Sequence, residues 1–247
     1  MLTVTLNRPE LLNAVNEQMA AELNDAVGFA GRAGEVRCVV LTGEGRGFCS
    51  GQDLRDRAGT TGISYGELLR ARLNPIVLGL RALEKPVIAA VNGVAAGAGC
   101  SLALAADLRI ASDRASFALS FSRIGLIPDG GATFLLPRLV GIARSFEIAF
   151  SGEPVPAAEA LRLGLVNRVV PHDDLPASVS QLARRLATGP TRAFGLTKRA
   201  VNAGLSGSLE AALEFEAHLQ EIAGQTADHG EGLAAFLEKR HPRFEGR

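Results

Sequence analysis

Short apolar runs alternate along the chain with longer stretches in which apolar residues recur at helical spacing. Strands are predicted at residues 2–10, where alternation ends at a proline, at 36–45, and at 85–99, which run into a Gly/Ala turn. Helices are predicted at 17–32 and 65–83, and residues 100–112 read as a helix followed by a strand. This rhythm predicts an α/β architecture, in which helices cover a sheet.

The pattern changes after about residue 190, where glycine turns thin out. Residues 191–204 and 208–225 have helical spacing. Ser208 is predicted to cap the second helix, because Glu210 and Glu214 follow early in it. We therefore expect a core at residues 1–189 and a helical oligomerisation region at 190–247.

Composition narrows the class of protein. A length of 247 residues with 47% hydrophobic residues fits one large domain or a domain with an appendage. Lys+Arg and Asp+Glu both number 26, so no net charge points to nucleic acid or an anionic membrane as partner. Cys38, Cys49 and Cys100 form no CxxC pair, and no long charge-free segment lacks glycine turns. We expect a cytoplasmic protein with no membrane partner.

Two glycine-rich turns are candidates for ligand binding. One is "GEGRGFCSGQDL" at residues 43–54, and the other is "NGVAAGAGCS" at residues 92–101, which opens a helix. Small residues let a ligand approach the backbone, and free N–H groups at a helix start favour negative charge. Each turn alone also fits an ordinary strand-to-helix connection.

The sequence lacks the common nucleotide, metal and nucleophile motifs. Gly93, Gly97 and Gly99 do not fit the dinucleotide-binding pattern, and Tyr65 has no lysine four residues later. Neither a phosphate loop nor an H-E-x-x-H or G-x-S-x-G motif occurs, and all four histidines lie late in the chain. No metal and no nicotinamide cofactor is expected.

Asp129 is the most unusual single position. It stands in the apolar stretch of residues 125–141, where Arg138 is the only other charged residue. Either the carboxylate caps the helix that follows, or it acts as an acid or base in a dry pocket that raises its pKa. The two roles are compatible.

The chain resembles the crotonase, or enoyl-CoA hydratase/isomerase, superfamily nearly end to end. The ordered set of matching stretches is residues 5–15, 36–54, 85–112, 121–141, 159–170 and 235–247. The resemblance implies a crotonase spiral of ββα units, a C-terminal helical trimerisation region and a coenzyme A thioester as substrate. It also implies an oxyanion hole of two backbone N–H groups, which fall on Gln52, after "SG", and Ala98, within "GAG".

Departures from the superfamily pattern bear on the reaction. The two glutamates of its hydratases fall on Ser101 and Phe121, so a two-carboxylate hydration mechanism is not available. Asp129 stands where some isomerases and the 4-chlorobenzoyl-CoA dehalogenases carry a catalytic aspartate. Residues 121–138 and 239–247 are most similar to 1,2-epoxyphenylacetyl-CoA isomerases.

A single aspartate suits an isomerase, because one base can remove an α-proton and return it at the γ-carbon while two amides hold the enolate. We expect an acyl-CoA isomerase that shifts a 3-enoyl double bond or rearranges a ring-epoxide phenylacetyl-CoA. Hydratase-like and dehalogenase-like enzymes stay open as alternatives, although the second expects an aromatic clamp and the chain has no Trp. A catalytically inactive acyl-CoA-binding protein is a further alternative.

The resemblance also suggests how partners bind. Coenzyme A, carried by the substrate as the only cofactor, is expected at Gln52, Asp53, Leu54 and Arg55, with Arg55 or Arg57 near a phosphate. Residues 55–73 should line the acyl pocket. We expect a homotrimer or homohexamer, because an apolar helix face would be costly to leave in water. That face comprises Leu209, Leu213, Phe215, Leu219 and Ile222.

Overall fold

The computed structural model describes residues 1–58 and 64–247, apart from the side chains of residues 57 and 58. Its larger sheet has five strands, all parallel, in the order β1-β2-β4-β6-β9. These strands are β1 (Leu2–Leu6), β2 (Val39–Gly43), β4 (Val87–Val91), β6 (Leu108–Ser112) and β9 (Arg168–Val170). All residues of β4 are buried, as expected for a central parallel strand covered on both faces.

A second sheet lies beside the first, with the order β3-β5-β7-β8. Its strands are β3 (Gly47–Cys49), β5 (Val94–Ala96), β7 (Ser116–Ala118) and β8 (Val155–Pro156). β2, β4 and β6 each lead into a strand of this second sheet, so successive repeats contribute to both sheets. This is the spiral of ββα units that the resemblance implied, and it is the α/β architecture that the sequence pattern predicted.

The second sheet corrects one detail of the sequence prediction. The two glycine-rich stretches were expected to be turns, but they contain β3 and β5. Both strands are three residues long and consist of Gly, Ala, Val, Phe and Cys. Such short strands carry too few residues to show an alternating pattern.

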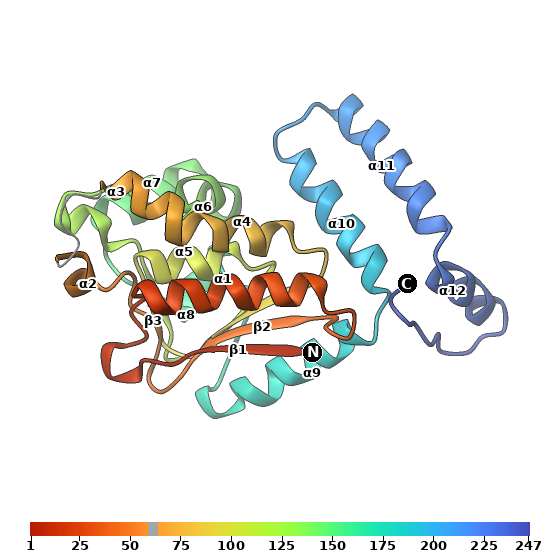
Figure 1. Ribbon diagram of the computed structural model, residues 1–247, viewed down its shortest axis with the longest axis horizontal. Coiled ribbons are helices and arrows are strands. Elements are labelled where there is room, and N and C mark those ends of the chain that lie inside the picture. Colours follow the sequence, from red (N-terminus) through yellow and green to blue (C-terminus); the bar gives the residue numbers. More distant parts are fainter. Residues whose placement is uncertain (59–63) are drawn as a thin grey trace.

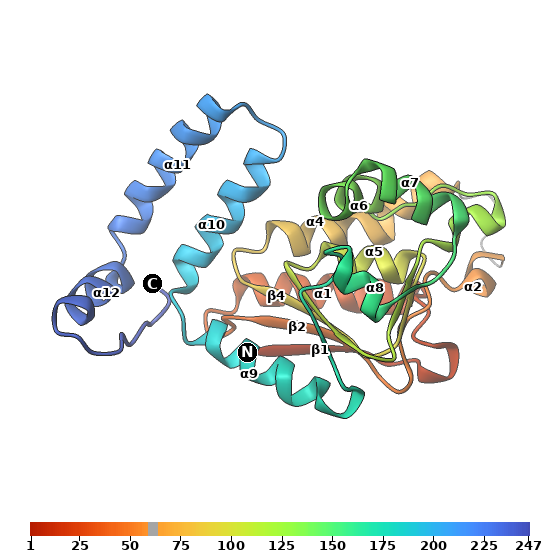
Figure 2. The same cartoon turned by 180° about the vertical axis from the view of Figure 1, so that it is seen from behind.

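Helices cover both faces of the larger sheet (Figures 1 and 2). α1 (Glu17–Arg32) and α4 (Asn74–Ala82) lie on one face, and α9 (Leu175–Ala187) lies on the other. The α1 start is fixed by Asn16, whose side chain accepts a hydrogen bond from the Met19 N–H. α9 packs against apolar residues of β2, β4 and β6, which include Val40, Ile88 and Ile110. The core therefore has two apolar layers.

Residues 65–83 were expected to form one helix, and they do so with an irregular turn. α3 (Tyr65–Leu68) continues through a π-helical turn, η2 (Leu69–Leu73), into α4. The Asn74 N–H donates to the Leu69 carbonyl, five residues earlier. Pro75 follows at once, and its ring would clash with the carbonyl that an ordinary turn places beneath it. The wider turn lets the helix continue past the proline.

The remaining helices and 3-10 turns connect the strands and helices described above. They are α2 (Leu54–Ala58), α5 (Ala98–Ala105), α6 (Ala132–Val140), α7 (Ile142–Ser151), α8 (Ala157–Arg162), and the 3-10 turns η1 (Pro9–Leu11), η3 (Ser120–Ile124) and η4 (His172–Asp174).

Three helices project from the core at the C-terminal end (Figures 1 and 2). They are α10 (Thr191–Gly204), α11 (Leu209–Gly224) and α12 (Ala227–Leu237), and the first two pack as a hairpin. Ser208 caps α11 as predicted, because its side chain accepts a hydrogen bond from the Ala211 N–H at 3.2 Å. The chain end returns to the core, where Arg37 donates to the Phe244 carbonyl at 3.0 Å.

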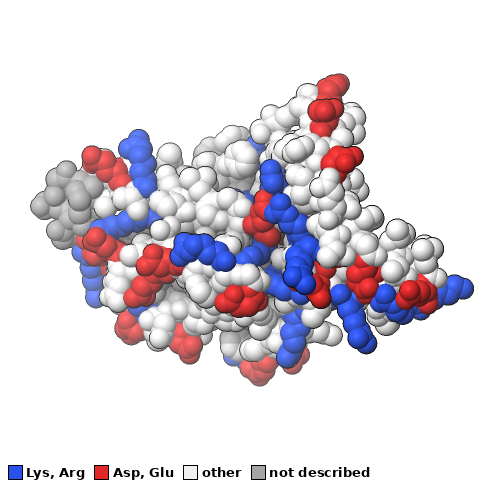
Figure 3. Space-filling model, turned by 45° about the vertical axis from the view of Figure 1, so that its right-hand side comes forward, with Lys and Arg blue, Asp and Glu red and all other residues white. Residues whose placement is uncertain are grey.

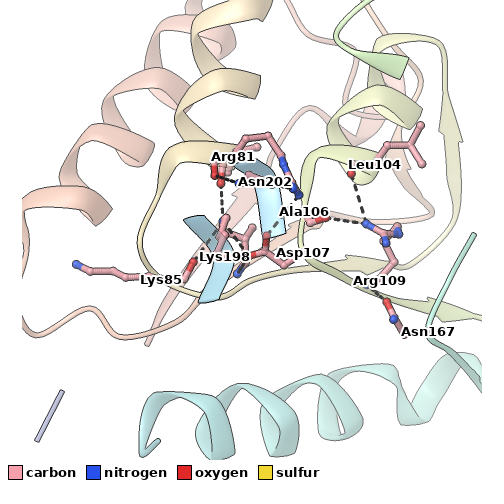
Figure 4. Close-up of polar contacts among 11 residues, drawn as sticks. Arg81, Lys85, Leu104, Ala106, Asp107, Arg109, Asn167, Lys198 and Asn202 are labelled. Carbon is pink, nitrogen blue, oxygen red and sulfur yellow. Dashed lines mark hydrogen bonds and ion pairs between the residues drawn. The ribbon is translucent and has the colours of Figure 1, made fainter. Parts of the chain in front are cut away.

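Lys198 anchors α10 to the core (Figure 4). Its Nζ lies 2.7 Å from the Leu80 carbonyl oxygen and 2.9 Å from Asp107 Oδ2, which also accepts from the Val87 N–H at 2.8 Å. Burial lowers the pKa of the Lys198 ammonium, and the charge of Asp107 opposes that shift. A partly buried ion pair thus helps to fix the projecting helices on the core.

Charges on the side of the C-terminal helices are mixed. Figure 3 shows basic and acidic side chains interspersed over this face, with much of the projecting part uncharged. Within the described part of the chain, no helix is both long enough and apolar enough to cross a membrane.

Candidate active site

The two predicted oxyanion peptides lie side by side. Gln52 follows β3, and Ala98 is the first residue of α5. Gly51 adopts φ +108, a conformation that L side chains rarely adopt. A Cβ on Gly51 would lie 3.4 Å from the Ala98 nitrogen and 3.1 Å from the Ala96 oxygen. The peptide before Gln52 is therefore in contact with the start of α5.

Both predicted N–H donors are available. Val15 pairs with the Gln52 segment through the Gly51 carbonyl and the Asp53 N–H, which leaves the Gln52 N–H outside this pairing. Ala98 opens its helix, so its N–H has no acceptor in the preceding turn. Among the residues that the structure describes, neither N–H has a hydrogen-bond acceptor. Two adjacent free donors suit a developing oxyanion.

Gly99 sets the distance between the two loops. A Cβ at this position would lie 2.2 Å from the Cys49 carbonyl oxygen, closer than any side chain can approach. The absence of a side chain therefore lets α5 begin directly against β3, which brings Ala98 towards Gln52.

Asp129 lies between η3 and α6 with a half-buried side chain. Its Oδ1 is buried and has no hydrogen-bond partner among the described residues. Burial raises the pKa of this carboxyl from 3.8 to about 6. The arrangement is that of a carboxyl held in a partly dry site, where it can exchange a proton near neutral pH.

The alternative that Asp129 caps the following helix is wrong. α6 begins at Ala132, its N-cap is Gly131 with φ +78, and no side chain caps it within the described structure. The backbone carbonyl of Asp129, not its carboxyl, accepts the Ala132 N–H at 3.1 Å. Two consecutive glycines in left-handed conformations carry the chain into the helix.

Ser101 and Phe121, at the positions of the hydratase glutamates, border the same loops. Ser101 is buried on α5, one turn after Ala98, and its Oγ donates to the Asp129 carbonyl at 2.8 Å. The buried Phe121 ring reaches towards Gly97, with Cζ 3.9 Å from the position of a Cβ there. The sequence placed both residues in the site, but it gave no signal for the bond from Ser101, because its acceptor is a backbone carbonyl.

The predicted coenzyme A residues continue from Gln52. The Asp53 carboxylate forms an ion pair with Arg8 at 2.9 Å and accepts the Arg55 N–H at 3.1 Å. Leu54 and Arg55 are exposed at the start of α2. The Arg57 side chain and residues 59–63, which were expected to contact a phosphate or line the acyl pocket, lie outside the described residues. The sequence did not identify Arg8, which anchors this segment.

Metal binding has no support in the described part of the chain, where no group of three or more His, Cys, Asp or Glu side chains could hold an ion.

The comparison with protein families identifies the fold. The family model described as enoyl-CoA hydratase/isomerase matches residues 1–247. The chain is a member of the enoyl-CoA hydratase/isomerase family. Family membership agrees with the paired sheets, the helical C-terminal region and the two adjacent loops described above.

Relatives within the enoyl-CoA hydratase/isomerase family carry different reaction names. The chain is 46% identical to the 1,2-epoxyphenylacetyl-CoA isomerase of Escherichia coli (strain K12), over 100% of this chain and 95% of the relative. It is 49% identical to the "Probable enoyl-CoA hydratase" of Rhodobacter capsulatus, with the same coverage. The crystal structure of the Bacillus anthracis enoyl-CoA hydratase superposes with a TM-score of 0.92 at 35% identity, covering 100% of this chain and 96% of that one. These similarities establish the enzyme family but do not decide between an isomerase and a hydratase reaction.

Proposed function

We propose that this protein is an acyl-CoA isomerase in which Asp129 moves a proton while the Gln52 and Ala98 amides hold a thioester enolate. One observation carries the proposal. The partly dry Asp129 carboxyl stands on a loop bonded to the helix that begins at Ala98, while Ser101 and Phe121 supply no carboxylate. Of these three positions, only Asp129 thus supplies a titratable carboxyl for proton transfer.

The reaction needs one base. The Asp129 carboxylate removes a proton from C2 of a 3-enoyl thioester, and the electron pair moves onto the thioester oxygen as an enolate. The protonated Asp129 then delivers the proton to C4, while the enolate electrons return and leave the double bond between C2 and C3. The two N–H donors stabilise the enolate, and one such donor typically contributes about 2.7–4 kcal/mol.

The raised pKa suits both halves of this cycle. With a pKa of about 6, the Asp129 carboxyl is ionised at neutral pH and ready to accept a proton. Its protonated form is still acidic enough to give the proton back, since an efficient acid–base group has a pKa near the working pH.

Coenzyme A is the only cofactor in this proposal, and it enters as part of the substrate. Its adenine and phosphates would lie along Gln52, Asp53, Leu54 and Arg55. The 46% identity to the Escherichia coli enzyme supports a ring-epoxide phenylacetyl thioester as one substrate class. Turnover of that thioester and of linear 3-enoyl thioesters, measured side by side, separates the two classes.

Hydration is the second candidate because relatives at 37–49% identity are named hydratases. That reaction needs groups that orient water and deliver its proton. The hydroxyl at Ser101 is bonded to the Asp129 carbonyl, and Phe121 is apolar, so these positions argue against efficient hydration.

Assembly as a homotrimer or homohexamer belongs to the same proposal. The Leu219 side chain of the predicted oligomerisation face is buried within one chain, whereas Leu209 and Leu213 are exposed. Further exposed apolar residues on these helices are Val201, Leu205, Leu233, Phe236 and Leu237. Covering them with other copies would remove a large apolar surface from water.

Replacing Asp129 tests the proposal. Asp129→Asn keeps the size of the side chain but cannot accept the proton, so isomerisation of a 3-enoyl-CoA should fall about 10²–10⁴-fold. Folding and coenzyme A binding should remain, and hydration of crotonyl-CoA should be weak in both proteins. Isomerisation at the parental rate by the Asn variant would overturn the role of Asp129.

A further inference from the structure

A single hydroxyl group joins the helix of the oxyanion hole to the backbone of Asp129. Ser101 lies on α5, and its Oγ is 2.8 Å from the Asp129 carbonyl oxygen and 3.4 Å from the Gly97 carbonyl oxygen. A serine hydroxyl has one proton to donate. The shorter contact is therefore the stronger bond, and the proton is directed mainly at Asp129.

The contact leaves little room for movement. The next residue, Gly130, is buried with φ +57, and a Cβ there would lie 2.8 Å from the Ser101 Cβ and 2.9 Å from the Leu73 Cδ2. The loop is thus held between α5 and the π-helical turn. Ser101 itself is 0% exposed, so its hydroxyl is shielded from bulk solvent.

We propose that Ser101 is a positioning residue, which sets the place of the Asp129 carboxyl relative to the oxyanion donor at Ala98. The proposal rests on the role of Asp129 given above. Ser101 touches neither the substrate nor the proton in this account, and it acts through the backbone of the base.

The reason is that proton transfer tolerates little displacement. The Asp129 carbonyl has two donors, the Ser101 hydroxyl and the Ala132 N–H. The first donor belongs to the helix whose N-terminal amide faces the enolate, whereas the second belongs to α6. Without the hydroxyl, the Asp129 carbonyl keeps only the hydrogen bond from α6. A resulting misplacement of the base by about 1 Å can cost about 10²-fold in rate.

Two substitutions at position 101 test the role. Ser101→Ala removes the hydroxyl, and Ser101→Cys keeps a similar shape with a much weaker donor. Both should lower kcat for 3-enoyl-CoA isomerisation by about 10- to 100-fold and leave KM nearly unchanged. Ser112→Ala is the matched control, because Ser112 is also 0% exposed but bonds to Arg114 and His172. This control should keep the parental kcat.

The Asp129→Asn background separates this proposal from the proposed function. If Ser101 acts through the base, Ser101→Ala should cause no further loss in that background. An equal further loss would mean that Ser101 supports the oxyanion donors instead, and the positioning role would be wrong. Parental kcat in Ser101→Ala, or in Ser101→Cys, would also overturn it. Parental isomerisation by Asp129→Asn alone would refute the role of Asp129, which is a different result.

Discussion

The hydroxyl oxygen of Ser101 and the backbone carbonyl oxygen of Asp129 lie 2.8 Å apart. The helix that begins at Ala98 therefore also holds the loop that carries the candidate base. In the proposed mechanism, α5 thus supplies one of the two enolate donors and also holds the loop of the proton-transferring base.

The first prediction concerns pH. The Asp129 carboxyl must be ionised to accept a proton, and its pKa is raised to about 6 by burial. Log(kcat/KM) for isomerisation should therefore rise with unit slope as pH increases to about 6 and then level off. A pH series on the parent checks this. A profile that levels off near pH 4 would show that the carboxyl is not desolvated in the free enzyme.

The second prediction concerns stability. Between pH 3.8 and about 6, the unfolded chain releases the Asp129 proton while the folded protein keeps it, so folding loses stability as pH rises. Asp129→Asn has no carboxyl at this position, so its stability does not fall in this way as pH rises. Relative to the parent, its free energy of unfolding should be higher at pH 8 than at pH 4 by about 1–2 kcal/mol, discounted for the partial exposure of the carboxyl. Urea unfolding at both pH values measures the difference. If the unfolding free energies of Asp129→Asn and the parent differ by the same amount at pH 4 and at pH 8, the Asp129 charge is not buried in the folded protein.

The sequence pattern predicts long helices of this protein but not its shortest strands. Long elements were predicted well, since the helix expected at residues 191–204 is α10 and that at 17–32 is α1. The three-residue strands β3 and β5 were missed, because their Gly- and Ala-rich residues show no alternation. The π-helical turn before Pro75 was also missed, since the apolar spacing continues through it.

In the candidate site, too, the sequence identified residues but not the contacts between them. Gln52, Ala98 and Asp129 were assigned from motif positions, and the structure brings their loops together around α5. The sequence left open whether Asp129 caps α6, because a carboxylate before a helix fits both roles, and the geometry excludes the cap. The hydrogen bond from Ser101 to the Asp129 carbonyl could not be predicted, because every residue type carries a backbone carbonyl.

The third prediction concerns the attachment of the C-terminal helices. Lys198 has a side chain only 10% exposed and paired with Asp107, whereas the neighbouring Arg199 is 39% exposed and paired with Glu84. Lys198→Met should lower the free energy of unfolding by about 2–3 kcal/mol, because it leaves Asp107 without its nearest cation. Arg199→Met should cost less than about 1 kcal/mol. Urea unfolding compares the two, and equal effects would argue against an anchoring role for Lys198.

The fourth prediction concerns assembly. Phe236 and Leu237 are 80% and 71% exposed near the end of α12. Light scattering at micromolar concentration should give a mass three or six times the 25.8 kDa of one chain. Phe236→Asp combined with Leu237→Asp should shift the mass towards the single chain, since two charges would then be buried between copies. A parental protein that measures as a monomer would contradict the assembly.

In the proposed reaction, Asp129 removes the α-proton of an acyl-CoA thioester. The most direct measurement follows deuterium at C2 of a 2,2-dideuterated 3-enoyl-CoA in ordinary water, by NMR or mass spectrometry. The parent should release deuterium from C2 as the double bond moves, with hydrogen or deuterium appearing at C4. Asp129→Asn should retain the C2 deuterium over the time in which the parent reaction is complete. Release at the parental rate by the Asn variant, or no release by the parent, would show that Asp129 is not the base.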